Sequence, residues 1–456
     1  MVTHAPRTVP TLAPPQRAQG TAGVRGTLAA GALVIVALWW HDPTQLRGPG
    51  ATVTSLGRLS GLLGAYAVLV QVLLLARLPW FERAVGFDRL TAWHRAAGTN
   101  IVILLGAHVL LIVEGYALAA QRGAVPTAWR VISTYPDMIK ALLGMGLFAL
   151  VAVTSARAVR ARVSYEAWWL LHLGAYAAVA LAFSHQTSSG ADFVGHPVNR
   201  LLWRAMYVAV GGCLLTWRVV LPLRAWSTHR LIVERVVPEG PGVVSVWVRG
   251  RHLEQMGAQS GQFLLWRFLS RGHLWTAHPY SLSAAPDGRH LRITVKASGD
   301  HSADLRRLRP GTPVLTEGPF GHFTAASSTR RRSLLIAGGV GIGPVRALAE
   351  TLARTAAPGD VVLLYRASRE EDLVLRGELA QLTAAYGVRV QHLIGRRAEL
   401  AEDPLGAPML MRLVPDLLNR DAFVCGPDGM TMAVLETLRD LGMRPSQLHA
   451  ESFSLR

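Results

Sequence analysis

The pattern of apolar and polar positions changes period near residue 226. Before that point, six apolar stretches are each about long enough to cross a bilayer as a helix, at residues 25–40, 58–78, 98–119, 138–156, 166–184 and 201–222. The first stretch has a long leader, and no small-residue cleavage site follows Trp39-Trp40-His41-Asp42, so we expect an uncleaved span. Residues 1–24 lack any periodic apolar pattern and are expected to form a disordered cytoplasmic tail.

After residue 226 the pattern is typical of strands and short helices. Apolar segments on both sides of Gly240-Pro241-Gly242 predict a strand–turn–strand unit, and further β segments are expected at 262–268, 291–296 and 312–316. From about residue 333, short buried strands alternate with helical segments, which predicts a parallel sheet covered by helices. These strands are expected at residues 334–337, 361–365, 388–391 and 421–425.

Charge and cysteine content restrict the class of protein. The net charge is +18, but the basic residues are spread along the chain with clusters between the apolar stretches, which favours membrane loops over nucleic-acid binding. The loop around residues 77–95 and the loop around residues 157–162 hold the most arginines, so both termini are expected in the cytoplasm. Cys213 and Cys425 alone cannot ligate an iron–sulfur cluster or build a disulfide framework.

Two histidine pairs lie inside the apolar stretches. His94 and His108 are 14 residues apart, and His172 and His185 are 13 residues apart. On a helix, 14 residues span about 21 Å, roughly two thirds of the hydrocarbon core. Histidine in a membrane span is costly and usually functional, and two helices can each supply one axial nitrogen per haem. The alternative is interhelical hydrogen bonding by unrelated histidines.

The two spacings differ in helical geometry. Fourteen steps return to within about 40° of the same helix face, whereas 13 steps end about 140° away. We therefore expect the fifth span to bend, to contain a π-bulge, or to present its histidines at different angles. The arginine distribution places His94 and His172 near the cytoplasmic face, and His108 and His185 near the outer face.

Two short motifs in the β region can contact a planar ring and a pyrophosphate. His278, Pro279, Tyr280 and Ser281 provide an aromatic ring, a hydroxyl and a rigid backbone, which suit the lining of a planar ring. The segment that begins at Val295 and Lys296 continues through Ser298, Gly299 and Ser302, where small residues and backbone N–H groups can approach a pyrophosphate. Each motif alone is also compatible with an ordinary turn.

A glycine-rich loop follows the strand at 334–337 and precedes a helix. Its members are Gly338, Gly339, Gly341, Gly343 and Pro344, and glycines there allow a dinucleotide to approach the helix N-terminus. The spacing is not Gly-x-Gly-x-x-Gly, so the strand–loop–helix context carries the interpretation. Arg366 and Ser368 end the next strand where an acidic residue would bind a ribose 2′-hydroxyl, which favours NADPH over NADH. Arg396 and Arg397 can add positive charge, or can be solvated surface residues.

Taken together, these motifs resemble those of the ferric reductase/NADPH oxidase superfamily over about residues 25–456. The resemblance implies a membrane six-helix haem-binding bundle at 25–225, a β-barrel FAD-binding domain at 226–327, and an α/β parallel-sheet NAD(P)H-binding domain at 328–456. It also implies that His94 pairs with His172 on an inner haem and His108 with His185 on an outer haem. The segment Cys425-Gly426-Pro427 resembles a nicotinamide dinucleotide motif of the family, and Phe453 resembles its flavin-covering aromatic residue.

The mechanism that the resemblance implies is electron transfer from cytoplasmic NADPH through FAD and two b-type haems to an outward acceptor, either oxygen or ferric iron. Arg58 is a candidate partner of a haem propionate, or a snorkelling interfacial arginine. The alternatives are a membrane flavocytochrome that reduces quinone or a periplasmic redox partner, and a channel or transporter with a nucleotide-sensing domain. The outer loops, at about 41–57, 120–137 and 186–200, hold no metal-binding cluster that would identify the acceptor.

Overall fold

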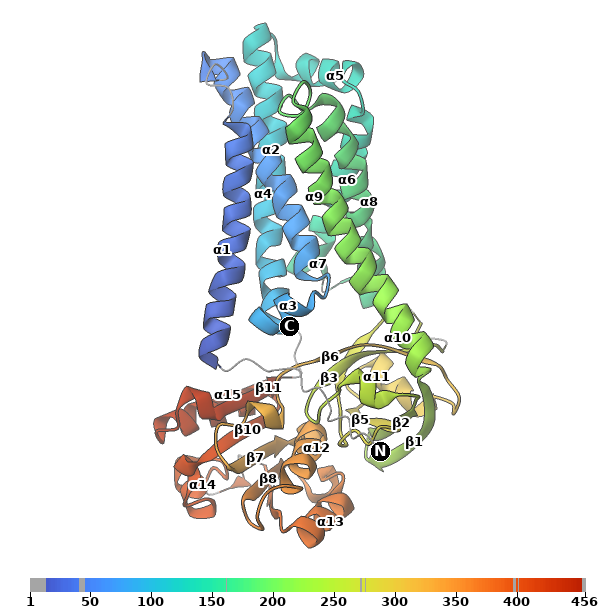
Figure 1. Cartoon of the computed structure of the whole chain (residues 1–456), viewed down its shortest axis with the longest axis vertical. Coiled ribbons are helices and arrows are strands. Elements are labelled where there is room, and N and C mark those ends of the chain that lie inside the picture. The colour runs from blue at the N-terminus through green and yellow to red at the C-terminus, as the bar shows by residue number, and fades with distance from the viewer. Residues whose placement is uncertain are drawn as a thin grey trace, which may run out of the picture. The chain divides into compact units, whose positions relative to one another are not determined.

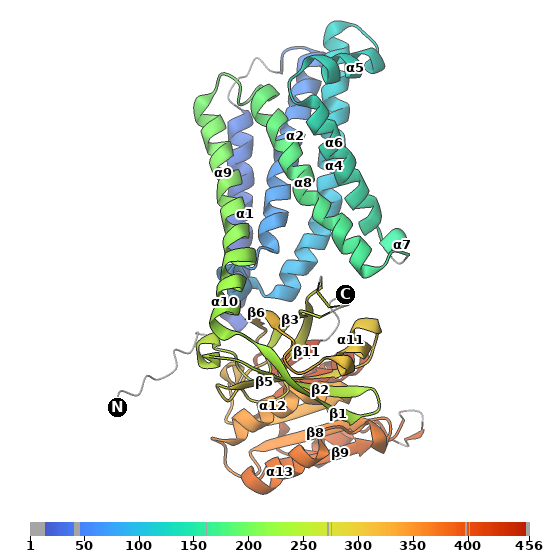
Figure 2. The ribbon, with the colours of Figure 1, turned by 90° about the vertical axis from the view of Figure 1, so that its right-hand side faces the viewer.

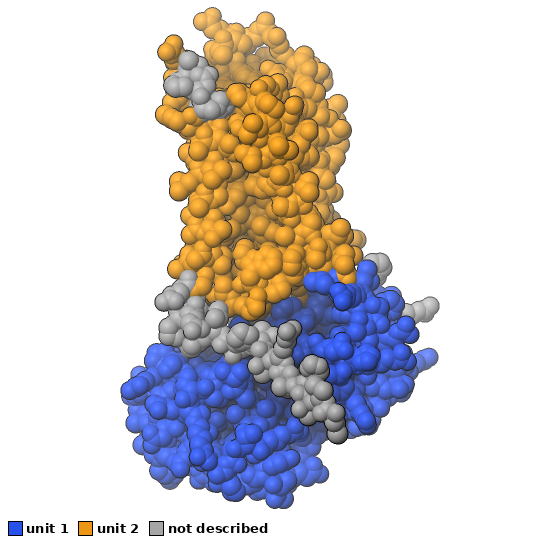
Figure 3. Space-filling model, in the orientation of Figure 1, with its two compact units in different colours: residues 1–14, 221–456 blue, residues 15–220 orange. Residues whose placement is uncertain are grey.

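The structure is a computed structural model that describes residues 14–40, 46–160, 162–270, 273–274, 276–396, 399–400 and 402–452. The chain divides into two compact units (Figure 3). The N-terminal unit comprises residues 15–220, and the C-terminal unit contains residues 221–456.

The N-terminal unit is helical (Figure 1). Its helices are α1 (Pro14–Trp39), α2 (Pro49–Leu74), α3 (Pro79–Val85), α4 (Phe87–Ala120), α5 (Ala124–Thr134), α6 (Met138–Ser155), α7 (Arg157–Arg160), α8 (Tyr165–Ser189) and α9 (Pro197–Leu215). Helix α4 packs along α2, and α8 packs along α6, so the two histidine-bearing helices have different main partners (Figure 2).

Within the described residues, six helices are long and apolar enough to cross a membrane, which confirms the six predicted spans. They cover Gly20–Trp39, Pro49–Leu74, Arg89–Ala120, Met138–Ser155, Ala167–Ser189 and Pro197–His229. Large apolar side chains such as Leu110 and Val208 are exposed on them, as expected for surfaces that contact lipid.

The helix bounds differ from the prediction in two places. Helix α1 begins at Pro14, so the later part of the expected tail is helical. The π-helical segment lies at Thr216–Val220, in the sixth span, and is followed by α10 (Leu221–His229). The fifth span, α8, is α-helical throughout, so of the three alternatives expected there the π-bulge is excluded.

The first part of the C-terminal unit, residues 232–320, is called the β domain here. It holds β1 (Ile232–Gly240), β2 (Val243–Arg249), β3 (Phe263–Phe268), β4 (His278–Ser281), β5 (His290–Lys296) and β6 (Val314–Phe320), with the short helix α11 (Asp300–Asp304) after β5. The strands form two antiparallel sheets of order β1-β2-β5 and β4-β3-β6. Isolated bridges join Ile232 to Pro313 and Leu282 to Ile293, so the two sheets touch at both pairs of edges.

The second part, residues 332–452, is called the α/β domain here. Its strands are β7 (Arg332–Gly338), β8 (Val361–Ala367), β9 (Arg389–Ile394), β10 (Arg420–Gly426) and β11 (Leu448–Ser452), and its helices are α12 (Ile342–Ala353), α13 (Arg376–Tyr386), α14 (Ala407–Leu413) and α15 (Asp428–Asp440). All strands pair in parallel, in the order β11-β10-β7-β8-β9, which confirms the predicted parallel sheet.

Strand periodicity explains how both faces of this sheet are covered. Leu335 and Leu363 point into a core shared with α12 and α13, whereas Leu334 and Val362 point into a core shared with α14 and α15. Strands buried on both faces have no polar positions to alternate with, which is why they are continuous apolar runs in the sequence. Strands β7 and β10 are parallel neighbours. From β7 the chain adds β8 and β9 on one side, and it then adds β10 and β11 on the other side. Ligands bind at such switch points, beyond the carboxyl ends of the strands.

Candidate functional site

The two histidines of α4 are held by backbone carbonyls of α2. Nδ1 of His94 lies 3.1 Å from the carbonyl oxygen of Gln71, and Nδ1 of His108 lies 2.8 Å from that of Gly57. A carbonyl oxygen only accepts hydrogen bonds, so Nδ1 must carry the proton in each ring. The lone pair is then on Nε2, which is the arrangement found in histidines that ligate metals.

Glycines on α2 allow this close approach. A Cβ atom at Gly61 would lie 2.4 Å from Nδ1 of His108, and one at Gly57 would lie 3.0 Å from the backbone nitrogen of Ile112. Small residues at helix contacts in membranes let backbones pack closely. The small residues therefore position the His108 ring as well as joining the helices.

The histidines of α8 have different surroundings. Nδ1 of His172 lies 3.3 Å from Oγ of Ser155, which also accepts a hydrogen bond from Nε1 of Trp168. The ring centroids of His94 and His172 are 6.1 Å apart, so the structure brings together the pair expected at the inner end. His185 is close enough to His108 for an electrostatic interaction, as expected for the outer pair.

Arg58 on α2 has a partner that the sequence did not indicate. Its Nη1 lies 3.8 Å from Oδ1 of Asp192, whose side chain is buried. The two expected environments, a propionate and the lipid interface, did not include this ion pair.

In the β domain, strand β4 carries the predicted flavin motif. The hydroxyl of Tyr280 lies 3.3 Å from Nδ1 of His301, and the centroids of the His278 and His301 rings are 3.6 Å apart, with the rings tilted by 30°. Burial and the neighbouring His278 and His273 lower the pKa of His301 to about 3, so this imidazole is neutral at physiological pH. Burial raises the pKa of Tyr280, which keeps its hydroxyl protonated. This cluster therefore presents neutral hydrogen-bonding groups beside an aromatic ring.

The predicted phosphate segment already has internal hydrogen bonds. Oγ of Ser302 accepts hydrogen bonds from the backbone N–H groups of Ser298, at 2.8 Å, and Gly299, at 3.1 Å. A pyrophosphate that used these two N–H groups would have to replace the Ser302 hydroxyl. Val295 is buried in the core of the β domain, whereas the Lys296 side chain is exposed.

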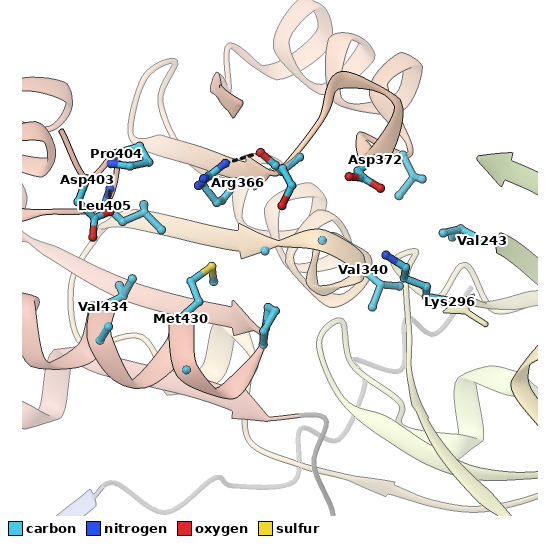
Figure 4. A pocket seen from close by; sticks show the side chains of 18 of the residues that line it. Val243, Lys296, Val340, Arg366, Asp372, Asp403, Pro404, Leu405, Met430 and Val434 are labelled. Atoms are coloured by element: carbon cyan, nitrogen blue, oxygen red, sulfur yellow. Dashed lines mark hydrogen bonds between the residues drawn. The ribbon is translucent and has the colours of Figure 1, made fainter. Parts of the chain in front are cut away.

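A pocket of about 410 Å³ lies beyond the carboxyl ends of the parallel strands, and residues 241, 243 and 296 of the β domain also line it (Figure 4). Six of the predicted residues line it: Lys296, Gly338, Gly339, Arg366, Ser368 and Pro427. The structure thus brings the glycine loop, the end of β8 and the end of β10 into one site.

The glycine loop fits tightly against β10. A Cβ atom at Gly341 would lie 2.2 Å from the carbonyl oxygen of Cys425, and one at Gly426 would lie 3.1 Å from Cα of Gly338. Gly339 has a positive φ of 54°, which favours glycine. Gly343 and Pro344 are buried at the start of α12, so they pack the helix rather than line the pocket.

The guanidinium group of Arg366 is held by backbone carbonyls. It donates to the carbonyl oxygens of Leu393, at 3.1 Å, and of Ala367 and Gly395. Burial lowers the pKa of Arg366, while the Asp403 carboxylate opposes that shift. These hydrogen bonds hold the guanidinium group in place at the pocket wall (Figure 4). Because the carbonyl oxygens carry no net charge, they do not neutralise its positive charge.

The two residues expected to be catalytic have different outcomes. Cys425 is fully buried at the end of β10, and burial raises the pKa of its thiol well above the usual range, so it is a neutral thiol. Phe453 and Arg397 lie outside the described residues.

Sequence reasoning missed several residues of the pocket. Asp403, Pro404 and Leu405 form one wall, and Met430 with Val434 on α15 form another. The sequence could have indicated these residues only through their position, because they follow β9 and β10 at the carboxyl edge of the sheet.

Comparison with known proteins agrees with both halves of the chain. Residues 60–183 match the family described as ferric reductase like transmembrane component, and residues 335–436 match the oxidoreductase NAD-binding domain. The chain is 31% identical to ferredoxin--NADP reductase B of Sorangium cellulosum over 191 residues, which are 38% of this chain and 77% of that protein. It is 28% identical over 185 residues to the glycine betaine monooxygenase reductase subunit of Chromohalobacter salexigens, covering 38% of this chain and half of that relative's length.

Among solved structures, the flavohem-like FAD/NAD binding domain of nitric oxide dioxygenase from Vibrio cholerae is similar, with 25% identity and a TM-score of 0.40. The match covers 49% of this chain and 98% of that structure.

The spans and the family matches define a class: an integral, multi-pass membrane oxidoreductase with a NAD-binding domain. Within that class, residues 60–183 match the ferric reductase like transmembrane component, and they are followed by a C-terminal module that belongs to the ferredoxin-NADP reductase family.

Proposed function

We propose that this protein takes electrons from NADPH on the cytoplasmic side and delivers them to an acceptor on the outer side, either oxygen or ferric iron. The reductase unit would hold FAD, and the helices would hold two b-type haems. When bound, these groups supply the two-electron and one-electron chemistry, and the protein supplies binding, orientation and electrostatics.

One observation carries the haem part of the proposal. Both α4 histidines donate from Nδ1 to a backbone carbonyl, which leaves Nε2 as a ligand atom at two depths of the same helix. His172 and His185 on α8 would supply the opposite ligands. His108 and His185 would then hold the outer haem, which would supply one-electron transfer to the acceptor.

The β domain is proposed as the FAD-binding barrel. In support, the strand order β1-β2-β5-β4-β3-β6 returns to β1 through the two isolated bridges. Tyr280 and His278 on β4 would line the flavin, with Ser281 at the end of the strand.

The pocket of the α/β domain is proposed to prefer NADPH. Arg366 presents a fixed positive charge and Ser368 a hydroxyl at the pocket wall, where a 2′-phosphate would lie. A charge-assisted hydrogen bond contributes about 1.5–3 kcal/mol. We therefore expect Arg366→Gln, and more weakly Ser368→Ala, to reduce the ratio of kcat/KM for NADPH over NADH, the former by about tenfold or more. Equal or better use of NADH by the wild type contradicts this preference.

The absorption spectrum of the purified protein tests the central proposal. We expect a b-type spectrum with about two haems per chain, reduced on addition of NADPH under anaerobic conditions. A protein without haem rules out the proposal. Superoxide and ferrous iron are then measured in parallel in intact membranes supplied with NADPH, to identify the acceptor.

A further inference from the structure

We propose that an ion-pair network centred on the buried Arg292 and the partly exposed Glu378 fixes the β domain against the α/β domain and so positions the flavin and nicotinamide rings for hydride transfer. This inference rests on the proposed function. Arg292 belongs to β5 and Glu378 to α13, so the two residues come from different domains.

The guanidinium group of Arg292 donates four hydrogen bonds. Its Nη2 donates to Oε2 of Glu378 at 2.9 Å, and its Nη1 donates to the other carboxylate oxygen. Its Nε donates to Oγ of Ser283 at 3.0 Å, and Nη2 also donates to the Ser283 carbonyl at 2.6 Å. The Arg292 side chain is only 2% exposed. The Glu378 side chain is 27% exposed. A bidentate pair of this kind defines both a distance and an angle between the domains.

The network continues along α12 and returns to the β domain. Nε of Arg346 lies 2.7 Å from Oε2 of Glu378, and its Nη1 pairs with Glu350 at 2.5 Å. Oε2 of Glu350 then accepts the backbone N–H of Ala285 at 3.2 Å. The α/β domain therefore contacts the 283–292 segment at two separate residues, Ala285 and Arg292.

A chain of hydroxyl groups packs the start of α12 onto the same strands. Oγ1 of Thr294 is 2.8 Å from Oγ of Ser283 and 2.9 Å from Oγ of Ser245. A Cβ atom at Gly343 would lie 3.3 Å from Cβ of Ser283, so the helix is in close contact with this chain. Gly343 belongs to the glycine loop, whose Gly338 and Gly339 line the nucleotide pocket.

These elements carry the two proposed ligand sites. Strand β5 ends at Lys296 in the pocket wall, β4 carries the flavin motif, and α12 follows the glycine loop. A partly buried ion pair adds little stability compared with apolar packing, but it specifies geometry. Because a misplacement of about 1 Å between reacting groups can cost about 100-fold in rate, this network affects hydride transfer more than ligand binding.

The test uses the full-length, FAD-loaded protein in detergent. In anaerobic stopped-flow experiments, we expect Glu378→Gln to slow reduction of FAD by NADPH by about tenfold or more. The dissociation constant of NADP+ should stay within about twofold of the wild type, because Glu378 does not line the pocket. Reduction of the flavin by dithionite, which needs no nicotinamide, should be unchanged.

Matched variants separate positioning from general damage. Glu370→Gln removes an exposed ion pair with Arg376, at 3.0 Å, just before the same helix, and should keep the wild-type rate. Glu350→Gln weakens the Ala285 contact while Arg292 stays paired, and should give a smaller loss in the same direction as Glu378→Gln. Glu350→Gln alone decides the test if Glu378→Gln fails to fold.

A readout independent of bound flavin is amide hydrogen exchange in the FAD-free protein. We expect Glu378→Gln to speed exchange in 283–292 and in α13, and not in β10. Wild-type hydride-transfer rates in both network variants overturn the inference. A wild-type protein whose FAD is not reduced by NADPH or NADH instead overturns the proposed function.

Discussion

At the scale of single residues, a neighbouring acceptor decides which nitrogen of an imidazole is available. His94 and His108 are each fixed in one tautomer by a carbonyl of α2. The sequence could identify these histidines, because a costly residue recurring at a helical spacing needs an explanation. It could not identify Gln71 or Gly57 as their partners, because a backbone carbonyl is present at every position and leaves no signal.

His108→Leu should remove one haem. Leucine keeps the apolar volume but has no ligand atom, so we expect about one haem per chain instead of about two in a pyridine haemochrome assay. His196→Gln, a substitution outside the two histidine pairs in the same unit, should keep both haems. Full haem content in His108→Leu would exclude His108 as a ligand.

His301 should make stability depend on pH. Its folded pKa of about 3 lies below the ordinary value of 6.5, so between these values the unfolded chain binds a proton that the folded protein does not. Stability is therefore lost as pH falls from about 6.5 towards 3. After discounting for partial exposure, His301→Gln should lose about 1 kcal/mol less than the wild type between about pH 7 and about pH 5. Thermal unfolding midpoints measured at both pH values check this, and equal losses in the two proteins would contradict it.

At the scale of elements, long apolar helices and doubly buried strands were predictable because their composition is unambiguous. Strand β4 was not predicted as a strand, since His278-Pro279-Tyr280-Ser281 has no alternating pattern, and the fold of the β domain pairs it with β3. Strand β11 was missed for a similar reason, because it is short and polar and pairs only at the edge of the sheet. The π-helical segment at Thr216–Val220 has no proline or glycine to mark it.

The contact between α2 and α4 gives a test of packing. Gly61→Ala would place a methyl group 2.4 Å from Nδ1 of His108, so the ring must move. We expect loss of the haem bound through His108 and a decrease in stability of about 1–3 kcal/mol. Gly211→Ala on α9, where a Cβ atom meets no described atom within 4 Å, is the matched control and should keep both haems. Haem content and unfolding midpoints of the two variants give the answer.

At the scale of the whole molecule, sequence comparison and fold both give a membrane unit and a reductase unit. The distribution of arginines predicts which loops lie on the cytoplasmic side of the membrane. Pocket residues such as Asp403 and Met430 could not be predicted, because only the parallel order of the strands brings β9, β10 and the glycine loop to one edge.

Alkaline phosphatase fusions test the orientation. Fusions at the C-terminus should be inactive, and fusions in the α8–α9 loop near residue 192 should be active, because the enzyme folds only outside the cytoplasm. Fusions in the loop near residue 160 should be inactive, because its arginines keep that loop inside. An active C-terminal fusion would reverse the proposed direction of electron flow.

Lys296 in the nucleotide pocket has a further consequence for the chemistry of the whole chain. The sequence has only one other lysine, Lys140, which pairs with Asp137 at the start of α6. On the proposed orientation the two side-chain amines lie on opposite sides of the membrane. An amine-selective reagent that cannot cross lipid would therefore modify one of them in sealed cells, and a dinucleotide aldehyde supplied from inside would modify the other. With only two lysines in the sequence, the proposed orientation places one lysine side chain on each side of the membrane.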